Sequence, residues 1–146
     1  MRNVSLGNFL IKRVADELKR ELPQLKTFCT LSPIPTLVPW LTRLQRLDAL
    51  PGVKPQQVER ALQSLTLLRK ACGDDLAGLS HAATLQAMPV AAHQALCRLA
   101  TLYLVHASPT PQGDPVARFH LDNGARLERL NANANLSARA SNKRRA

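Results

Sequence analysis

Two proline-bearing segments place the strongest constraints on how this chain can fold. The first is Thr30-Leu31-Ser32-Pro33-Ile34-Pro35, and the second is Pro115-Val116-Ala117-Arg118-Phe119-His120. Each proline fixes its own φ near about −65° and disfavours the helical conformation of the residue before it. Ser32 is therefore expected at the end of an extended run rather than inside a helix. If His120 folds back against Ser32, the two side chains form a nucleophile–base or proton-transfer pair.

Most of the remaining chain has apolar residues at helical spacing. Residues 8–22 predict an amphipathic helix, with Asn8 as its N-cap and Pro23 as its stop. Residues 55–72 predict a second helix, which Gly73 ends. Three further helices are expected over residues 39–47, 74–88 and 90–106, and the last is the most apolar.

Short segments that alternate like strands accompany these helices. Residues 25–31 end at a proline, and residues 119–121 and 126–130 flank the hairpin turn signal Asn123-Gly124. The expected fold class is therefore α/β and rich in helix, with a short sheet and four to five helices.

Length and charge narrow the class of protein. A chain of 146 residues suits one domain with a sizeable core. The net charge of +10 suggests nucleic-acid binding. However, residues 118–146 supply half of this excess, with seven Arg or Lys against Asp122 and Glu128, and a basic tail binds polyanions without specificity. With only 3% aromatic residues, the stacking platform of single-strand binders is missing. No specific nucleic-acid partner is expected, and a phosphorylated ligand explains part of the basic charge equally well.

The cysteines and the apolar runs predict neither a metal site nor a membrane segment. Cys29, Cys72 and Cys97 form an odd set without C-x-x-C spacing, so reduced thiols are expected and no metal. Charge or proline interrupts every apolar run before membrane-spanning length. Because the first residues do not form a secretory signal, a cytoplasmic location is expected.

Three blocks of this sequence resemble the malonyl-CoA decarboxylase family. They are Leu6-Gly7-Asn8-Phe9-Leu10-Ile11-Lys12-Arg13-Val14, then Leu31-Ser32-Pro33-Ile34-Pro35 with Trp40-Leu41, and finally Pro115-Val116-Ala117-Arg118-Phe119-His120-Leu121 followed by Asn123-Gly124-Ala125-Arg126-Leu127-Glu128-Arg129-Leu130-Asn131. They occur in the family's order and at similar separations. The resemblance implies that residues 1–137 are part of a C-terminal catalytic domain with an acetyltransferase-like mixed fold, truncated at both ends. Residues 138–146 are then a basic, unstructured tail.

The resemblance also implies an activity. The family decarboxylates malonyl-CoA to acetyl-CoA and carbon dioxide in fatty-acid and malonate metabolism, which makes this chain a carboxy-lyase. The family's catalytic serine and histidine correspond to Ser32 and His120. Two assignments stay open: His120 relays the proton while Ser32 binds the malonyl group, or Ser32 donates the proton after His120 polarises it. No cofactor is implied, because the thioester carbonyl itself accepts the developing charge.

The same resemblance assigns the ligand-binding residues and the partners. The substrate-binding residues implied are Arg2, Asn3, Val4, Ser5, Leu6, Gly7, Asn8, Ser32 and His120. Malonyl-CoA and acetyl-CoA are the expected partners, without a membrane, and the full-length family can form homo-oligomers. Two alternatives remain: an inactive acyl-CoA-binding remnant, and a basic helical interaction protein in which the motifs are incidental.

Overall fold

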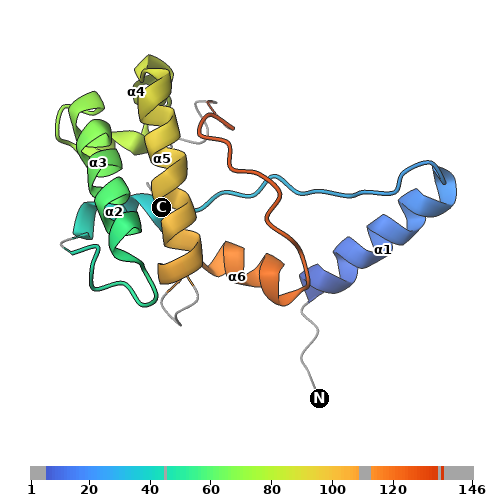
Figure 1. Ribbon diagram of the computed structural model, residues 1–146. Coiled ribbons are helices and arrows are strands. Elements are labelled where there is room, and N and C mark those ends of the chain that lie inside the picture. The colour runs from blue at the N-terminus through green and yellow to red at the C-terminus, as the bar shows by residue number, and fades with distance from the viewer. Residues whose placement is uncertain (1–5, 45, 109–112, 135, 137–146) are drawn as a thin grey trace. The chain divides into compact units, whose positions relative to one another are not determined.

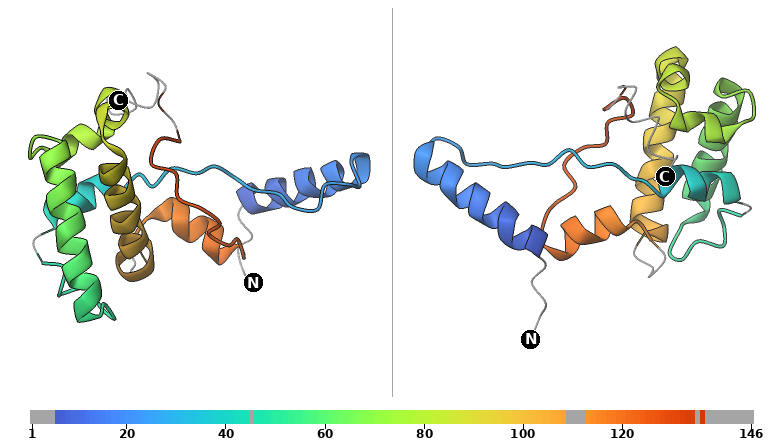
Figure 2. Two further views of the ribbon diagram at one scale, coloured as in Figure 1. Left: turned by 45° about the horizontal axis from the view of Figure 1, so that its top comes forward. Right: turned by 180° about the vertical axis from the view of Figure 1, so that it is seen from behind.

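The computed structural model describes residues 6–44, 46–108, 113–134 and 136. The chain consists of two compact units, the first of residues 1–32 and the second of residues 33–146. The regular elements of both units are helices, as the ribbon in Figures 1 and 2 shows.

The first unit contains one long helix and the segment that follows it. Helix α1 spans Leu6–Glu21, and its end continues into a turn in which the Leu25 amide donates to the Leu22 carbonyl. The Lys19 ammonium lies 5.7 Å from the centre of the Phe28 ring, so the segment after the helix contacts α1. None of the described side chains in this unit is buried. Its large exposed apolar residues are Phe9, Leu10, Ile11, Val14, Leu22, Leu25, Phe28 and Leu31.

The second unit carries the remaining helices. In chain order they are α2 (Leu37–Arg43), α3 (Pro55–Ala71), the 3₁₀-helix η1 (Leu76–Ser80), α4 (Ala82–Ala87), α5 (Val90–Leu102), the π-helix η2 (Tyr103–Ala107) and α6 (Pro115–Asp122). Helices α3 and α5 form the most extensive contact, and Figure 1 shows them side by side.

Leucine dominates the core of this second unit. Leu41 of α2, Leu68 of α3 and Leu99 of α5 are completely buried, and Leu76 and Leu79 of η1 pack into the same cluster. The apolar positions of α3 and α5 recur at three- and four-residue intervals, which places them on one side of each helix. The repeat in the sequence thus accounts for the way these two helices pack.

Several expected helices are confirmed with shifted ends. Helix α3 ends as expected, because Gly73 follows it with a φ of +63° that L-residues rarely adopt. Asn8 is not the N-cap of α1, since the helix begins at Leu6. The expected helix at 39–47 is α2 and begins two residues earlier, the expected helix at 74–88 is divided into η1 and α4, and the expected helix at 90–106 comprises α5 and η2.

The expected sheet, and with it the α/β and acetyltransferase-like fold class, is wrong for the described residues, which include no strand. Residues 25–31 and 126–130 belong to neither a helix nor a strand, and a strand is stable only when a neighbour satisfies its amides and carbonyls. The segment containing His120 is helix α6 instead, because Asp114 caps it and Pro115 occupies its first position.

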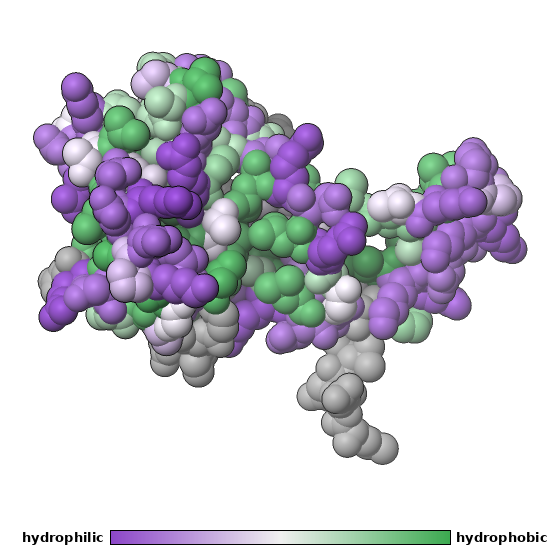
Figure 3. Space-filling view, viewed as in Figure 1, coloured by the Kyte–Doolittle hydropathy of each residue, from purple (hydrophilic) through white to green (hydrophobic). Residues whose placement is uncertain are grey.

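The surface mixes polar and apolar groups. Figure 3 shows hydrophobic residues interspersed with hydrophilic ones on the visible face. Within the described part of the chain, no helix combines the length and the apolar character needed to cross a bilayer. The proposed tail, residues 138–146, lies outside the described residues and stays a prediction.

Candidate functional site

His120 lies near the end of α6, and the start of that helix is strongly fixed. The Oδ1 atom of Asp114 accepts hydrogen bonds from the amides of Val116 at 3.0 Å and Ala117 at 2.9 Å. These two amides have no partner within the helix, so the carboxylate satisfies them and also opposes the partial positive charge of the helix end. The first turn of α6 is thereby held, and His120 follows about one and a half turns later.

The imidazole of His120 is half-buried. The ring of Phe119 contacts it edge-on, with centroids 5.2 Å apart and an interplanar angle of 79°. The His120 carbonyl accepts from the Ala125 amide at 3.0 Å, and Gly124 takes a φ of +83° between them. The turn signal at Asn123-Gly124 therefore ends a helix rather than joining two strands.

Asp114 makes a second set of contacts through its other oxygen. Oδ2 accepts from the Thr36 hydroxyl at 2.7 Å and from the Thr36 amide at 3.2 Å. Asp114 is fully buried, yet each carboxylate oxygen has two donors, so the cost of removing it from water is offset. The single side chain joins the start of α6 to the residue just before α2.

Tyr103 extends this hydrogen-bonded chain. Its hydroxyl lies 2.5 Å from the Thr36 Oγ1 atom. Thr36 gives its only hydroxyl proton to the carboxylate, which can only accept, so Tyr103 donates to Thr36. Burial raises the pKa of Tyr103, the hydrogen bond with Thr36 opposes this rise, and the charge of Asp114 adds to it. The phenol therefore stays a neutral donor well into the alkaline range.

The backbone around Asp114 is equally constrained. Its amide donates to the Ser108 Oγ atom at 3.2 Å, and Ser108 is itself buried. A Cβ on Gly113 would lie 1.8 Å from the Ser108 carbonyl oxygen, so no other residue fits there. Ser108 directly follows the π-helix η2, a rare geometry that is often found at functional sites.

Ser32 lies in a different setting. It is exposed, belongs to neither a helix nor a strand, and is the last residue of the first unit, whereas His120 belongs to the second. Ser32 lies outside every helix, as the proline that follows it predicts. The pairing of Ser32 with His120 stays a prediction.

The expected substrate-binding stretch is only partly described. Residues 2–5 lie outside the described residues. Leu6 is the first residue of α1, so Gly7 and Asn8 are inside the helix rather than in a loop before it. Gly7 is exposed, which leaves its backbone accessible.

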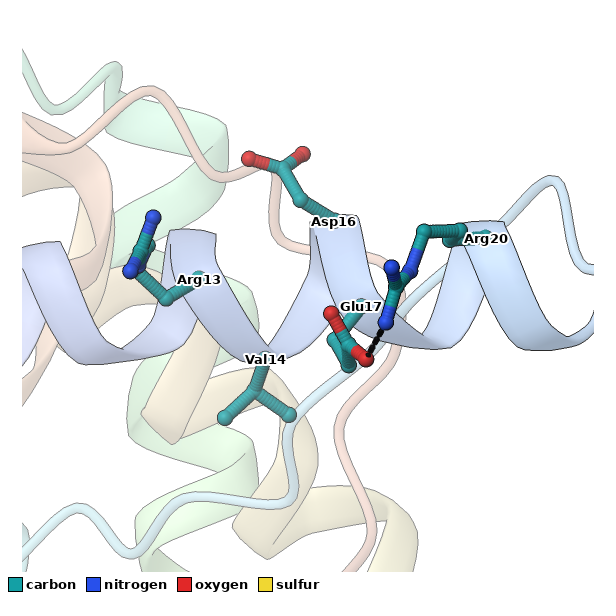
Figure 4. Close-up of a pocket in the computed structure, with 5 residues that line it drawn as sticks. All are labelled: Arg13, Val14, Asp16, Glu17 and Arg20. Atoms are coloured by element: carbon teal, nitrogen blue, oxygen red, sulfur yellow. Dashed lines mark hydrogen bonds and ion pairs between the residues drawn. The ribbon is translucent and has the colours of Figure 1, made fainter.

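A pocket on α1 contains none of the predicted catalytic residues. Its lining, shown in Figure 4, consists of Arg13, Val14, Asp16, Glu17 and Arg20. All five residues are exposed and come from one helix, and Arg20 forms an ion pair with Glu17. This surface is open to solvent rather than enclosed. Among the described residues, no group of three His, Cys, Asp or Glu side chains could hold a metal ion.

Sequence reasoning missed Asp114, Thr36 and Tyr103. One signal for Asp114 was present, because aspartate followed by proline is typical of a helix start. Nothing in the sequence indicated that Thr36, which is 78 residues away, donates to the same carboxylate.

Comparisons with known proteins bear on identity. Malonyl-CoA decarboxylases named as mitochondrial from Anser anser anser, Rattus norvegicus and Mus musculus are 34%, 35% and 34% identical to this chain. Each alignment covers 90% of this chain but only 27% or 28% of the relative, so the chain spans about a quarter of their length. No solved structure gives a significant match.

The names of these relatives contradict the expected cytoplasmic location. That expectation rested on the missing secretory signal, which does not separate cytoplasm from mitochondria, because mitochondrial transit peptides have a different composition.

A family comparison covers nearly the whole chain. The family model for the malonyl-CoA decarboxylase C-terminal domain matches residues 1–145. Together with the identity to the three relatives, this match confirms the family that the three sequence blocks resemble. The chain belongs to the malonyl-CoA decarboxylase family, in the region of its C-terminal domain.

Proposed function

We propose that this chain acts in the decarboxylation of malonyl-CoA to acetyl-CoA and carbon dioxide, as a carboxy-lyase of fatty-acid and malonate metabolism. The observation that carries the proposal is the match of residues 1–145 to the malonyl-CoA decarboxylase C-terminal domain. The names of the three relatives support the same reaction.

The chemistry requires two kinds of help from the protein. The bond between C2 and the free carboxylate breaks, its electron pair forms a thioester enolate, and C2 then takes up a proton. A donor at the enolate oxygen contributes about 10²–10³ in rate, and a positioned acid about 10²–10⁴. The thioester carbonyl accepts the electrons, so the reaction needs no cofactor as an electron sink.

Ser32 and His120 supply these groups in our proposal. The exposed Ser32 hydroxyl, which directly precedes Pro33, suits a hydrogen bond to the malonyl group. The half-buried imidazole of His120, on a capped helix, suits proton transfer. The reverse assignment, in which Ser32 delivers the proton after His120 polarises it, fits the same reaction.

The phosphate groups of coenzyme A are assigned to residues 2–8, namely Arg2, Asn3, Val4, Ser5, Leu6, Gly7 and Asn8. The start of α1 presents unpaired amides with a partial positive charge, which favours a phosphate group. An exposed glycine at position 7 allows close approach of the ligand. The absence of a specific nucleic-acid or membrane partner and the formation of homo-oligomers remain predictions.

Turnover of malonyl-CoA by variants of the purified chain tests the assignment of residues. We expect His120→Asn and Ser32→Ala each to lower acetyl-CoA formation by at least about a hundredfold while acetyl-CoA affinity stays within about twofold. His81→Asn is the matched control, because His81 is exposed and its side chain caps no helix.

Three outcomes are informative. Unchanged turnover in His120→Asn would refute the role of that residue. Acetyl-CoA binding without any turnover by the unaltered chain would favour the acyl-CoA-binding alternative. A steep salt dependence of non-specific DNA binding, with no affinity for acetyl-CoA, would favour the basic interaction protein.

A further inference from the structure

Asp114 links two segments that the proposed reaction uses. Its Oδ1 atom caps the helix that carries His120, and its Oδ2 atom accepts both the amide and the hydroxyl of Thr36. Thr36 directly follows the run Ser32-Pro33-Ile34-Pro35. A helix cap alone would use only the first set of contacts.

A second aspartate shows what capping alone looks like. Asp75 precedes η1, and its Oδ1 atom accepts from the Ala77 amide at 2.9 Å. Asp75 is exposed, and its side chain accepts this hydrogen bond from within its own turn. Asp114 is instead completely buried, and its side chain bonds across 78 positions of sequence. The burial and the long-range contact distinguish Asp114 from an ordinary cap.

Covalent geometry keeps both proposed catalytic residues within short reach of this link. Thr36 follows Ser32 by four positions, with three residues between them, and such a segment spans at most about 14 Å. Two of its residues are prolines, which remove backbone freedom. His120 follows Asp114 by six positions along α6, a rise of about 9 Å.

The hydroxyl groups of Tyr103 and Thr36 strengthen the connection that Asp114 makes between these two segments. Tyr103 donates to Thr36, and Thr36 donates to Asp114, so each bond polarises the next. Trp40 packs against the Tyr103 ring with centroids 5.0 Å apart, which holds the phenol in place. Ser108 and Gly113 fix the backbone of Asp114 from the other side.

We propose that Asp114, acting through Thr36, is a positioning residue for the reaction: it fixes the helix of His120 relative to the residue that follows the Ser32 run. The proposal rests on the proposed function of Ser32 and His120. Asp114 itself touches no reacting atom in this role. Its effect is on the rate of the chemical step, because small displacements of catalytic groups lower rates steeply.

The decisive variant is Asp114→Asn. Its side-chain oxygen can still cap α6, since asparagine and aspartate cap helices about equally well. The nitrogen that replaces the other oxygen is a donor and cannot accept from the Thr36 amide. The substitution therefore breaks the link selectively, and Asp75→Asn is the matched control.

Two measurements are made on the full chain: amide hydrogen exchange, and kcat and KM for malonyl-CoA. In Asp114→Asn we expect exchange at the Thr36 amide to rise by at least about tenfold, because that amide loses its acceptor. We expect kcat to fall by about ten- to a hundredfold and KM to stay within about twofold. Asp75→Asn should leave Thr36 exchange, kcat and KM within about twofold.

A second pair of variants covers the case in which Asp114→Asn does not fold. Thr36→Val removes the hydroxyl from the link, whereas Thr36→Ser keeps it. We expect Thr36→Val to lower kcat by about tenfold and Thr36→Ser to restore it to within about twofold. Equal kcat values in these two variants would overturn the proposal.

The failure of this proposal can be told apart from failure of the proposed function. Absence of turnover by the unaltered chain would count against the function, while exchange at Thr36 would still test the link. Unchanged exchange at Thr36 in Asp114→Asn would overturn the link. Raised exchange with an unchanged kcat, or an equal loss of kcat in Asp75→Asn, would overturn the positioning role.

Discussion

The two units of this chain use similar residues with opposite results. Helix α1 in the first unit and helix α5 in the second both carry apolar residues at helical spacing. In α5 these residues are buried, and Leu99 is completely removed from solvent. In α1 none of the described side chains is buried, and Leu10 is 53% exposed.

The difference shows what an amphipathic pattern does and does not determine. The pattern determines that a helix forms and which of its faces is apolar. Stability comes from burying that face, at about 25 cal/mol per Å² of apolar surface. The second unit gains this energy from the contact of α3 with α5, and the first unit relies on local contacts such as Lys19 with Phe28.

Truncating one leucine in each unit tests this difference in burial with the largest expected effect. We expect Leu99→Ala to lower the free energy of unfolding by about 3–5 kcal/mol, because it leaves a cavity in the core. Leu10→Ala on α1 should cost less than about 0.5 kcal/mol. Urea denaturation of both variants measures the difference, and similar losses would mean that α1 is packed as tightly as α5.

Asp114→Ala tests the polar part of the second unit. It removes the cap of α6 and leaves the Thr36 amide and hydroxyl without their acceptor. We expect a loss of about 2–3 kcal/mol, against about 1 kcal/mol for Asp75→Ala. Equal losses in thermal or urea unfolding would show that Asp114 contributes only as a cap.

Tyr103→Phe gives a pH-dependent prediction. Losing the hydrogen bond to Thr36 should cost about 1 kcal/mol at neutral pH. The pKa of Tyr103 is raised in the folded chain, mainly by burial, so the folded state keeps this proton longer than the unfolded state does. The stability that the phenol contributes is therefore complete below pH 10, the usual pKa of tyrosine, and is lost as the pH rises through the higher pKa of the folded chain.

The free energies of unfolding of the unaltered chain and of Tyr103→Phe, measured at several alkaline pH values, test the direction of this pH dependence. The advantage of the unaltered chain over Tyr103→Phe should shrink above about pH 10. An advantage that stays constant or grows there would contradict the raised pKa.

The smallest effect is expected at an exposed ion pair. Arg126 and Glu128 are joined at 2.8 Å, but their side chains are 84% and 72% exposed. Arg126→Ala should change the free energy of unfolding by less than about 0.5 kcal/mol, because water screens such pairs. A change above 1 kcal/mol in urea denaturation would indicate that the extended segment contributes more than its exposure suggests.

Local patterns in the sequence predicted much of the helical content. The spacing of Leu65 and Leu68 in α3, or of Leu96 and Leu99 in α5, depends only on neighbours within the same helix. Pro23 and Gly73 likewise act within one turn of the chain. These features needed no knowledge of the tertiary structure.

The prediction of a sheet was wrong because a strand is stable only when a second strand pairs with it. Residues 126–130 alternate as a strand does, yet the sequence cannot indicate whether another segment will pair with them. The short apolar run before Asn123 fits a helix or a strand, and the cap at Asp114 decides for the helix.

The candidate site was predictable only in part. The resemblance to the family singled out Ser32 and His120 without indicating what holds either of them. The bond between Thr36 and Asp114 joins positions far apart in sequence, and which donors satisfy a buried carboxylate is decided by packing.

The most direct test of the proposed decarboxylation follows the carbon atom of the free carboxylate of malonyl-CoA. Malonyl-CoA labelled with ¹³C in its free carboxylate is incubated with the purified chain, and the label is followed by NMR beside a His120→Asn sample. We predict that the label appears as carbon dioxide and bicarbonate at the rate at which acetyl-CoA forms, and that His120→Asn stops both. Label that stays in malonyl-CoA, or that appears in free malonate through thioester hydrolysis, would contradict the account.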